Sequence, residues 1–260
     1  MRIAISGATG RMGQSITRIA MQEGVTIVGA IASSSSKHIG KDVGDVAGAG
    51  HVGVAIGDDV GAALLGADVV IDFSRPEGLS RVLSAARRAG IAVVSGTTRL
   101  DAAVDKQLGE AAAAIAVLWA PNTSLGVQVL AELVAEAVRR LGPGFDIEIV
   151  ETHHKGKVDS PSGTAVRLAD AAREARKELR AVHGREGNVG PRAEDEIGVF
   201  AVRGGDVIGD HSVHLLGLGE RIELTHRATN RDLFARGALR AARFLVGKPA
   251  GRYTMADVLG

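Results

Sequence analysis

Residues 151–165 combine several proton donors with a place that favours an anion. His153, His154 and Lys157 lie shortly before the triplet Ser162-Gly163-Thr164. A serine ahead of helix-forming residues is typical of a helix start, where backbone N–H groups and the helix dipole favour negative charge. Histidine titrates near neutral pH, and lysine carries a full positive charge. The segment therefore predicts a site in which an acidic small molecule is held and protonated.

Within this segment we expect a division between proton donation and anion binding. Ser162 or Thr164 is expected to cap a helix over about 164–179, while N–H groups of Gly163 and Thr164 bind a carboxylate. His153 or His154 donates a proton, and Lys157 supplies charge. The competing interpretation is a structural cap flanked by solvated basic residues.

The chain opens with a strand-like run followed by a glycine-rich turn at residues 7–13. The spacing is G-x-x-G-x-x-G, a variant of the dinucleotide fingerprint, in which glycines permit a sharp turn, approach of a pyrophosphate and close helix packing. The competing interpretation is a purely structural turn. The expected cofactor contacts in this turn are Gly7, Ala8, Thr9, Gly10, Arg11 and Met12.

The residues after the second predicted strand bear on the choice between NADH and NADPH. An acidic residue usually binds the ribose hydroxyls of NAD at this point, but residues 32–37 contain none. Ser33 and Ser34, with Lys37 nearby, suit a 2′-phosphate. We therefore expect NADPH to be preferred, with NADH as the alternative.

Two further turns follow predicted parallel strands at the edge where open α/β sheets bind ligands. Their small polar groups are expected to line the nicotinamide or its ribose, and turn chemistry alone is the alternative. The residues are Gly96, Thr97, Thr98, Ala120, Pro121, Asn122 and Thr123.

The histidine spacing argues against a metal centre. His153 and His154 are adjacent, and His211 and His214 are three apart on a predicted strand. In extended backbone each pair points to opposite sides, so neither forms a ready chelate. We expect no metal.

The elements that must position these residues indicate an α/β fold. Short apolar runs alternate with helical patterns over the first 120 residues, as in βαβ units with a parallel Rossmann-type sheet. A weak strand is expected at 52–56.

After Ser124 the sequence pattern changes. It predicts a helix, then a half-buried strand near 145–149 and further strands at 196–203, 207–216 and 220–228. We expect a hairpin turn at 203–206, a loop at 183–195 and a last helix capped by Asn230. This second domain is predicted to be a smaller α+β unit with a mixed sheet.

Composition excludes several functions. The 260 residues carry 31 Lys plus Arg against 30 Asp plus Glu, so no global field recruits nucleic acid or an acidic membrane. The chain has no cysteine, which removes disulfides, thiolate metal sites and cysteine nucleophiles. The longest apolar run, 111–121, is far shorter than the roughly 20 residues of a membrane helix. No signal peptide is recognisable at the start, so we expect a cytoplasmic protein.

Seven segments of the chain resemble the dihydrodipicolinate reductases (4-hydroxy-tetrahydrodipicolinate reductases) of the diaminopimelate–lysine pathway. The resemblance runs nearly from end to end, and the H-H-x-x-K pattern followed by S-G-T is highly specific to the family. The matching segments are 7–13, 71–78, 96–98, 122–126, 151–165, 203–205 and 247–248.

The resemblance implies a cytoplasmic homotetramer with a dinucleotide-binding domain at 1–123 and 233–260. Residues 124–232 form the substrate-binding and tetramerisation domain. By matching positions, His153 is the acid/base residue and Lys157 the proton donor. The residues matched to substrate binding are His154, Ser162, Gly163 and Thr164. The chain departs from relatives at Ser33 and Ser34, where an acidic and then a basic residue select NAD and NADP, and this puts the cofactor preference in doubt.

The expected reaction is hydride transfer from a nicotinamide to an unsaturated cyclic imine dicarboxylate, followed by protonation. Two alternatives remain open. One is another NAD(P)-dependent oxidoreductase, such as an aspartate dehydrogenase. The other is a non-catalytic nucleotide sensor.

Overall fold

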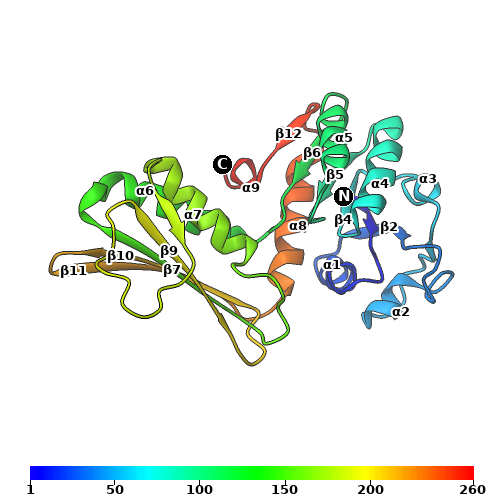
Figure 1. The fold of residues 1–260 in the computed structure, drawn as a ribbon. Coiled ribbons are helices and arrows are strands. Elements are labelled where there is room, and N and C mark those ends of the chain that lie inside the picture. Colours follow the sequence, from blue (N-terminus) through cyan, green and yellow to red (C-terminus); the bar gives the residue numbers. More distant parts are fainter. The chain divides into compact units, whose positions relative to one another are not determined.

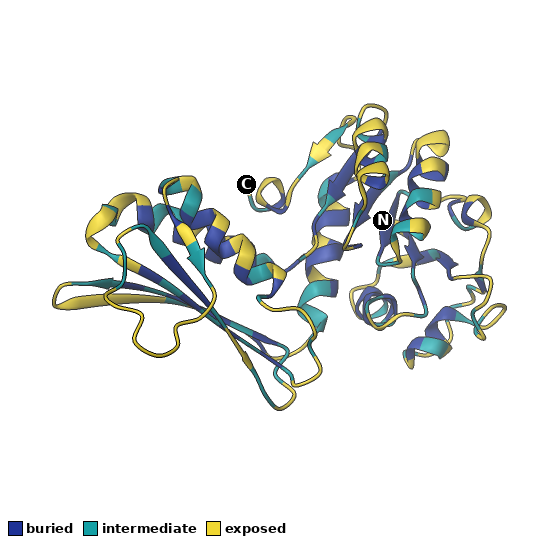
Figure 2. Cartoon of the chain, in the orientation of Figure 1, coloured by how far each residue is buried: buried dark blue, intermediate teal, exposed yellow.

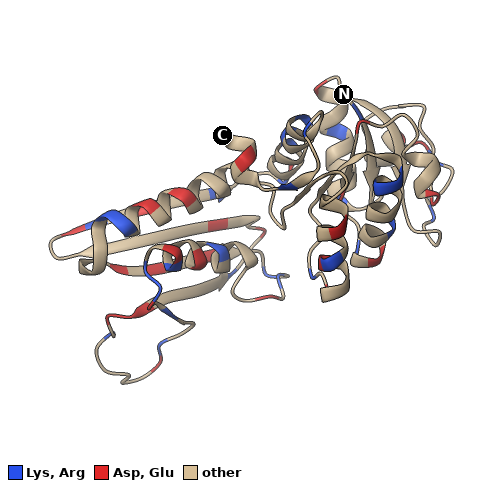
Figure 3. Ribbon diagram, turned by 90° about the horizontal axis from the view of Figure 1, so that it is seen from above, with Lys and Arg blue, Asp and Glu red and all other residues tan.

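The computed structural model describes all residues from 1 to 260, and the chain divides into two compact units (Figure 1). Unit 1 comprises Met1–Leu125 and Arg231–Gly260, and unit 2 comprises Gly126–Asn230. The sequence had placed the corresponding limits at 123 and 233. Figure 3 shows acidic and basic residues on both units, in keeping with the net charge of +1. No helix is long and apolar enough to cross a membrane.

Unit 1 contains a seven-stranded sheet in which every pairing is parallel, in the order β12-β6-β5-β4-β1-β2-β3. The expected Rossmann-type sheet is confirmed. The strands are β1 Arg2–Ser6, β2 Thr26–Ile31, β3 Ile56–Gly57, β4 Val69–Asp72, β5 Ala92–Ser95, β6 Ala116–Trp119 and β12 Gly251–Tyr253.

Helices cover both faces of this sheet, and its strands are mostly buried (Figure 2). Alternate strand residues belong to two different cores. Ile3 and Ile5 belong to the core with α1 and α8, while Ala4 and Val70 belong to the core with α4 and α5. The strands therefore read as continuous apolar runs because both faces are buried. The helices are α1 Arg11–Gln22, α2 Val43–Ala47, α3 Val60–Ala63, α4 Pro76–Ala89, α5 Ala102–Ala112, α8 Asp232–Leu245 and α9 Met255–Leu259.

Local sequence signals mark the ends of two helices of unit 1. Pro76 occupies the first turn of α4, and Gly90 ends that helix with a φ of 70°. The Asp101 carboxylate accepts the Val104 N–H at the start of α5. Helix α8 belongs to unit 1, although it follows unit 2 in the sequence.

Unit 2 contains a five-stranded mixed sheet in the order β11-β10-β7-β9-β8, with α6 and α7 contributing to the core on one face. The expected mixed sheet is confirmed, because β9 runs parallel to β7 and β8 while β10 runs antiparallel to β7 and β11. The elements are α6 Leu125–Leu141, the 3₁₀ turn Gly142–Gly144, β7 Asp146–His153, α7 Gly163–Ala175, β8 Arg180–Val182, β9 Glu196–Arg203, β10 Gly209–Gly217 and β11 Glu220–Ala228.

Three local predictions were wrong. The expected strand at 52–56 is reduced to β3, because the N–H groups of Val52, Gly53 and Val54 donate to the Asp42 carboxylate instead of a neighbouring strand. The predicted helix at 164–179 ends at Ala175. Arg231, not Asn230, directly precedes the first residue of α8 and occupies its N-cap position, where it makes no side-chain cap hydrogen bond.

The turn at residues 203–206 is not a hairpin. Strands β9 and β10 are not neighbours, because β7 lies between them. The turn instead crosses the end of β7, where Gly204 N donates to the His153 carbonyl at 2.9 Å and His154 N donates to the Val207 carbonyl at 2.7 Å. This arrangement places Arg203 beside the end of the strand that carries His153.

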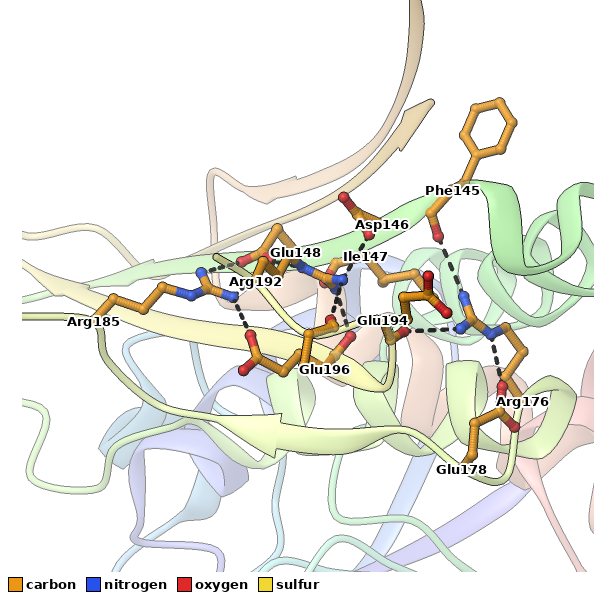
Figure 4. Close-up of polar contacts among 11 residues, drawn as sticks. Phe145, Asp146, Ile147, Glu148, Arg176, Glu178, Arg185, Arg192, Glu194 and Glu196 are labelled. Atoms are coloured by element: carbon orange, nitrogen blue, oxygen red, sulfur yellow. Dashed lines mark hydrogen bonds and ion pairs between the residues drawn. The ribbon is translucent and has the colours of Figure 1, made fainter. Parts of the chain in front are cut away.

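The loop at 183–195 forms as predicted and is held to the sheet by arginines (Figure 4). Arg185 donates to both Glu148 oxygens at 3.0 Å, and Arg192 donates to Glu148 at 2.9 Å and to Asp146 at 2.6 Å. Gly198 leaves the room that the Glu148 carboxylate uses, because a Cβ there would lie 1.9 Å from Glu148 Oε2. Charge pairs therefore hold the loop to the sheet.

Candidate functional site

The glycine-rich turn of unit 1 has two glycines, Gly7 and Gly13, at positions where the backbone leaves no room for a Cβ. Gly7 has a φ of 76°, and a Cβ there would lie 2.4 Å from the Phe73 carbonyl oxygen. A Cβ at Gly13 would lie 2.3 Å from the Gly7 oxygen. Gly10 is the N-cap position of α1, and a Cβ there would meet only the Gly7 oxygen, at 3.2 Å. The turn leaves an open approach to a helix N-terminus, which fits a dinucleotide pyrophosphate.

The other predicted residues of this turn differ in exposure. Ala8 is buried and donates its N–H to the Ile31 carbonyl, whereas Thr9 and Met12 are half-buried and Arg11 is exposed at the start of α1. The turn therefore presents the Arg11 side chain to solvent.

Ser33 and Ser34 follow β2 and are exposed. The Ser33 hydroxyl lies 2.9 Å from the Ser35 hydroxyl, and the Ser33 carbonyl accepts the Ser36 N–H at 2.8 Å. The segment is a hydroxyl-rich turn without a carboxylate.

The turn at 96–98 is organised by Asp72, a fully buried carboxylate that the sequence analysis had not singled out. Its oxygens accept the hydroxyls of Ser74 at 2.6 Å, Ser95 at 2.9 Å and Thr97 at 2.6 Å. Gly96 packs on the Phe73 ring, where a Cβ would lie 2.1 Å away. The Thr97 side chain therefore serves the turn itself, and Thr98 is the exposed member.

The turn at 120–123 also combines buried residues with more exposed ones. Ala120 and Thr123 are buried, and the Thr123 hydroxyl donates to the Phe234 carbonyl of α8 at 2.8 Å. Pro121 is exposed, and Asn122 is half-buried with its side-chain oxygen accepting the Ser124 N–H. Since β5 and β6 are neighbouring parallel strands, this turn and the turn at 96–98 lie at the same edge of the sheet.

In unit 2, His153 is only 8% exposed and its Nδ1 lies 2.6 Å from an oxygen of Glu151. Glu151 itself is completely buried and accepts two hydrogen bonds from Arg203, at 2.7 and 2.9 Å. Burial raises the pKa of Glu151, but the bonds from Arg203 and His153 more than offset it, so the pKa lies below its usual range. Glu151 is therefore an ionised carboxylate hydrogen-bonded to His153.

The same surroundings act on His153. Burial lowers the pKa of His153, and the Glu151 carboxylate raises it, with a net shift below the usual value. His211 lies edge-on to His153 with ring centroids 5.1 Å apart, and burial lowers the pKa of His211 to about 4. Both rings are therefore mainly neutral at neutral pH.

Lys157 lies in the loop after β7 with its side chain 18% exposed. Its Nζ donates to both oxygens of Asp159, at 2.8 and 2.7 Å, and this hydrogen bond lowers the pKa of Asp159. Lys157 is a predicted site residue, whereas its partner Asp159 is not. An anionic ligand that binds Lys157 must compete with Asp159.

The predicted helix start is present, and Ser162 is its cap. The Ser162 hydroxyl accepts the Ala165 N–H at 3.2 Å, while Ser162 N–H donates to Glu151 at 2.9 Å. Gly163 and Thr164 form the first turn of α7, where N–H groups point out of the helix end. Half-buried His154 follows β7 directly. The predicted proton donors and the predicted anion-binding residues therefore lie on consecutive elements of one unit.

Histidine placement matches the expectation that His211 and His214 lie on opposite faces of β10, since His211 is buried and His214 pairs with Glu223. One group has the spacing of metal ligands, namely Asp42, Asp45 and His51. Asp42 accepts five backbone N–H bonds, which accounts for its carboxylate without an ion.

Unit 1 has a parallel sheet with a glycine turn at its ligand edge, and unit 2 has a buried histidine near a helix start. These features are those of two-domain dinucleotide-dependent reductases. Comparison with known families narrows this class. Residues 1–123 match the family model for the N-terminus of dihydrodipicolinate reductase, and residues 126–259 match the model for its C-terminus. The chain belongs to the dihydrodipicolinate reductase family.

Individual relatives agree with this assignment. The chain is 52% identical to the 4-hydroxy-tetrahydrodipicolinate reductase of Methanopyrus kandleri, over 99% of this chain and 96% of that protein. It is 49% identical to the enzyme of the same name from Anaeromyxobacter dehalogenans strain 2CP-1, over 100% and 97%. The fold matches dipicolinate-bound dihydrodipicolinate reductase from Paenisporosarcina sp. TG-14 with a TM-score of 0.79, at 22% identity and over 99% and 98% of the two chains.

Proposed function

We propose that this chain is an NAD(P)H-dependent 4-hydroxy-tetrahydrodipicolinate reductase of diaminopimelate and lysine biosynthesis. The observation that carries the proposal is His153, a buried histidine fixed by an ionised carboxylate next to the capped start of α7. It occurs in a chain about half identical to enzymes of that name. The dipicolinate in the related structure suits a dicarboxylate substrate.

Different residues of unit 2 have different roles in the proposed reaction. A bound reduced nicotinamide supplies a hydride to the conjugated ring of the substrate. Negative charge then develops on the ring, and Lys157 stabilises it and donates a proton to the enamine-like carbon or nitrogen. His153 acts as the acid/base partner through its Nε2, because its Nδ1 is committed to Glu151.

Anion binding falls to the start of α7 and its neighbours. Gly163 and Thr164 offer first-turn N–H groups, and the helix dipole favours a carboxylate there. His154 and the Ser162 cap complete the proposed substrate-binding set. Lys157 exchanges Asp159 for the substrate when the ligand arrives.

In unit 1 the cofactor is assigned to the residues of the sheet edge. The open Gly10 position and the first turn of α1 suit the pyrophosphate. Gly96–Thr98 and 120–123 suit the nicotinamide half, chiefly through Thr98, Pro121, Asn122 and main-chain atoms. The exposed hydroxyls of Ser33 and Ser34, with exposed Lys37, support NADPH over NADH. A homotetrameric assembly and a cytoplasmic location belong to the same proposal.

A coupled assay tests the function. A synthase that condenses pyruvate with aspartate semialdehyde generates the cyclic imine, and oxidation of NADPH or NADH is followed by absorbance. We expect turnover with either cofactor, a higher kcat/KM with NADPH, and none with aspartate and oxidised cofactor. Binding of NADPH without turnover would instead support a nucleotide sensor.

His153→Gln is the matched active-site variant, and His183→Gln, an exposed histidine in the loop after β8, is its control. Loss of general acid catalysis lowers kcat by roughly 10²–10⁴-fold in His153→Gln. The control keeps the kcat of the unaltered chain. Equal kcat values for the two variants would remove His153 from the mechanism.

A further inference from the structure

Glu151 occupies a position that stability alone does not explain. It is 0% exposed, yet it is charged and hydrogen-bonded to His153, Ser162 and Arg203. Buried ion pairs often contribute little net stability, because desolvation offsets their attraction. We propose that Glu151 is a positioning residue for the reductase reaction: its carboxylate fixes the tautomer and orientation of His153 and ties the start of α7 to the same point. This proposal rests on the proposed role of His153.

One carboxylate oxygen controls the histidine. Glu151 Oε2 lies 2.6 Å from His153 Nδ1, and an ionised carboxylate can only accept a hydrogen bond. The hydrogen of neutral His153 must therefore lie on Nδ1. Its Nε2 is then a bare acceptor, and in the imidazolium form Nε2–H is the proton to be donated.

The other oxygen controls the anion-binding end. Glu151 Oε1 accepts the Ser162 N–H at 2.9 Å, and the Ser162 hydroxyl caps α7 and lies 3.1 Å from His211 Nε2. The residue that orients the proposed acid also holds the cap of the helix that is assigned the substrate carboxylate. A shift of Glu151 would therefore move both together.

Arg203 supplies the positive charge that stabilises the buried carboxylate of Glu151. Its guanidinium forms a two-bond fork on Glu151 and donates a further bond to the Asp159 carbonyl at 2.7 Å. The parallel pairing of β7 and β9 brings Arg203 opposite His153. Arg203 thus keeps Glu151 ionised and connects it to the segment that carries Lys157.

Titratable and charged groups surround His153 on every neighbouring element. Glu151 lies on its own strand, Arg203 on β9, His211 on β10 and Lys157, paired with Asp159, in the following loop. His226 on β11 lies across from His211. Of these, Glu151 is the contact that raises the pKa of His153, whereas burial, Lys157 and Arg203 lower it.

The variant Glu151→Gln separates these roles because it keeps the shape and removes the charge. Ser162 N–H and Arg203 Nη2 both donate to the Oε1 position, so the amide oxygen lies there. The amide NH₂ then faces His153 Nδ1 and displaces Arg203 Nη1, which donates to Oε2 in the unaltered protein. His153 then accepts at Nδ1 and carries its hydrogen on Nε2. We expect kcat to fall about 100-fold with little change in KM, and the kcat-against-pH profile to move to lower pH.

Long-range ¹H–¹⁵N spectra of the imidazole rings provide a readout independent of activity. The His153 signals are assigned by their loss in His153→Gln. The unaltered protein is expected to show the Nδ1–H tautomer and Glu151→Gln the Nε2–H tautomer. The control is Glu148→Gln. Glu148 lies on β7 like Glu151, but its carboxylate pairs with Arg185 and Arg192. This variant should keep the Nδ1–H tautomer of His153 and the kcat of the unaltered protein.

The outcomes are separable. If the unaltered protein shows Nε2–H at His153, the proposal is overturned even if Glu151→Gln does not fold. An unchanged tautomer and pH profile in Glu151→Gln also overturn it. If His153→Gln keeps full activity while the tautomer switches as expected, Glu151 orients His153 but the proposed catalytic role of His153 fails. Glu151→Asp, which keeps the charge, should restore the Nδ1–H tautomer and part of kcat.

Discussion

At the scale of single residues, the proposed proton donors of unit 2 are each held by a carboxylate. His153 is bound by Glu151, and Lys157 is bound by both oxygens of Asp159. A carboxylate orients the donor that it binds, but it also competes with an anionic substrate. The surroundings of Lys157 are therefore suited to a donor that exchanges Asp159 for the substrate on binding.

Replacing Lys157 by alanine tests this assignment. Lys157→Ala removes the charge that stabilises the developing negative ring, and kcat should fall by roughly 10²–10⁴-fold. Steady-state kinetics at saturating imine measure the effect. Lys155→Ala, an exposed lysine two residues earlier, should retain kcat. A Lys157→Ala enzyme with near-normal kcat would show that the proton comes from elsewhere.

At the scale of elements, Asp42 joins α2 to the segment before β3. Its carboxylate caps α2 through Gly44 N–H and Asp45 N–H and also accepts three N–H bonds from 52–54. Burial opposes ionisation, but these bonds outweigh it and lower the pKa of Asp42 from 3.8 to about 2. Asp42 thus replaces the strand pairing that the sequence had suggested there.

The stability from Asp42 has a definite pH dependence. Because its folded-state pKa is lowered, the contribution is fully present above pH 3.8 and is lost as pH falls through about 2. Asp42→Asn should lower the free energy of unfolding at pH 7 by about 1–3 kcal/mol, with a smaller difference near pH 3. Urea unfolding followed by the fluorescence of Trp119, the single tryptophan, measures it.

The control for Asp42 is the cap of a neighbouring helix. Asp59 accepts one N–H bond, from Ala62, at the start of α3. Asp59→Asn should cost less than Asp42→Asn at pH 7. Equal losses in the two variants would mean that the bonds to 52–54 contribute nothing.

At the scale of the whole molecule, the two units differ in how they respond to acid. Unit 2 contains three histidines, His153, His211 and His226, whose pKa values are lowered chiefly by burial. Each must gain a proton on unfolding at mildly acidic pH. Stability from these groups is present above pH 6.5 and is lost as pH falls toward their folded-state pKa values.

His211 has a lowered pKa of about 4 and should dominate this acid sensitivity. Between pH 7 and pH 5 the chain should lose about 2 kcal/mol of unfolding free energy through His211, in a urea titration followed by circular dichroism. His211→Gln should be less stable at pH 7 but lose less on acidification, whereas exposed His183→Gln should behave like the unaltered chain. An identical pH slope in all three proteins would refute the assignment.

The sequence by itself determined what depends on local patterns. Apolar runs alternate with helical patterns, Ser162-Gly163-Thr164 mark a helix start, and the glycines of residues 7–13 mark a sharp turn between a strand and a helix. The tertiary structure decided what depends on distant pairing. Arg203 reaches Glu151 across 52 positions because β9 pairs with β7 and not with β10, and Thr97 reaches Asp72 because β4 and β5 are neighbours. Local periodicity contains no information on which strands become neighbours, so the buried partners that orient the site were visible only in the fold.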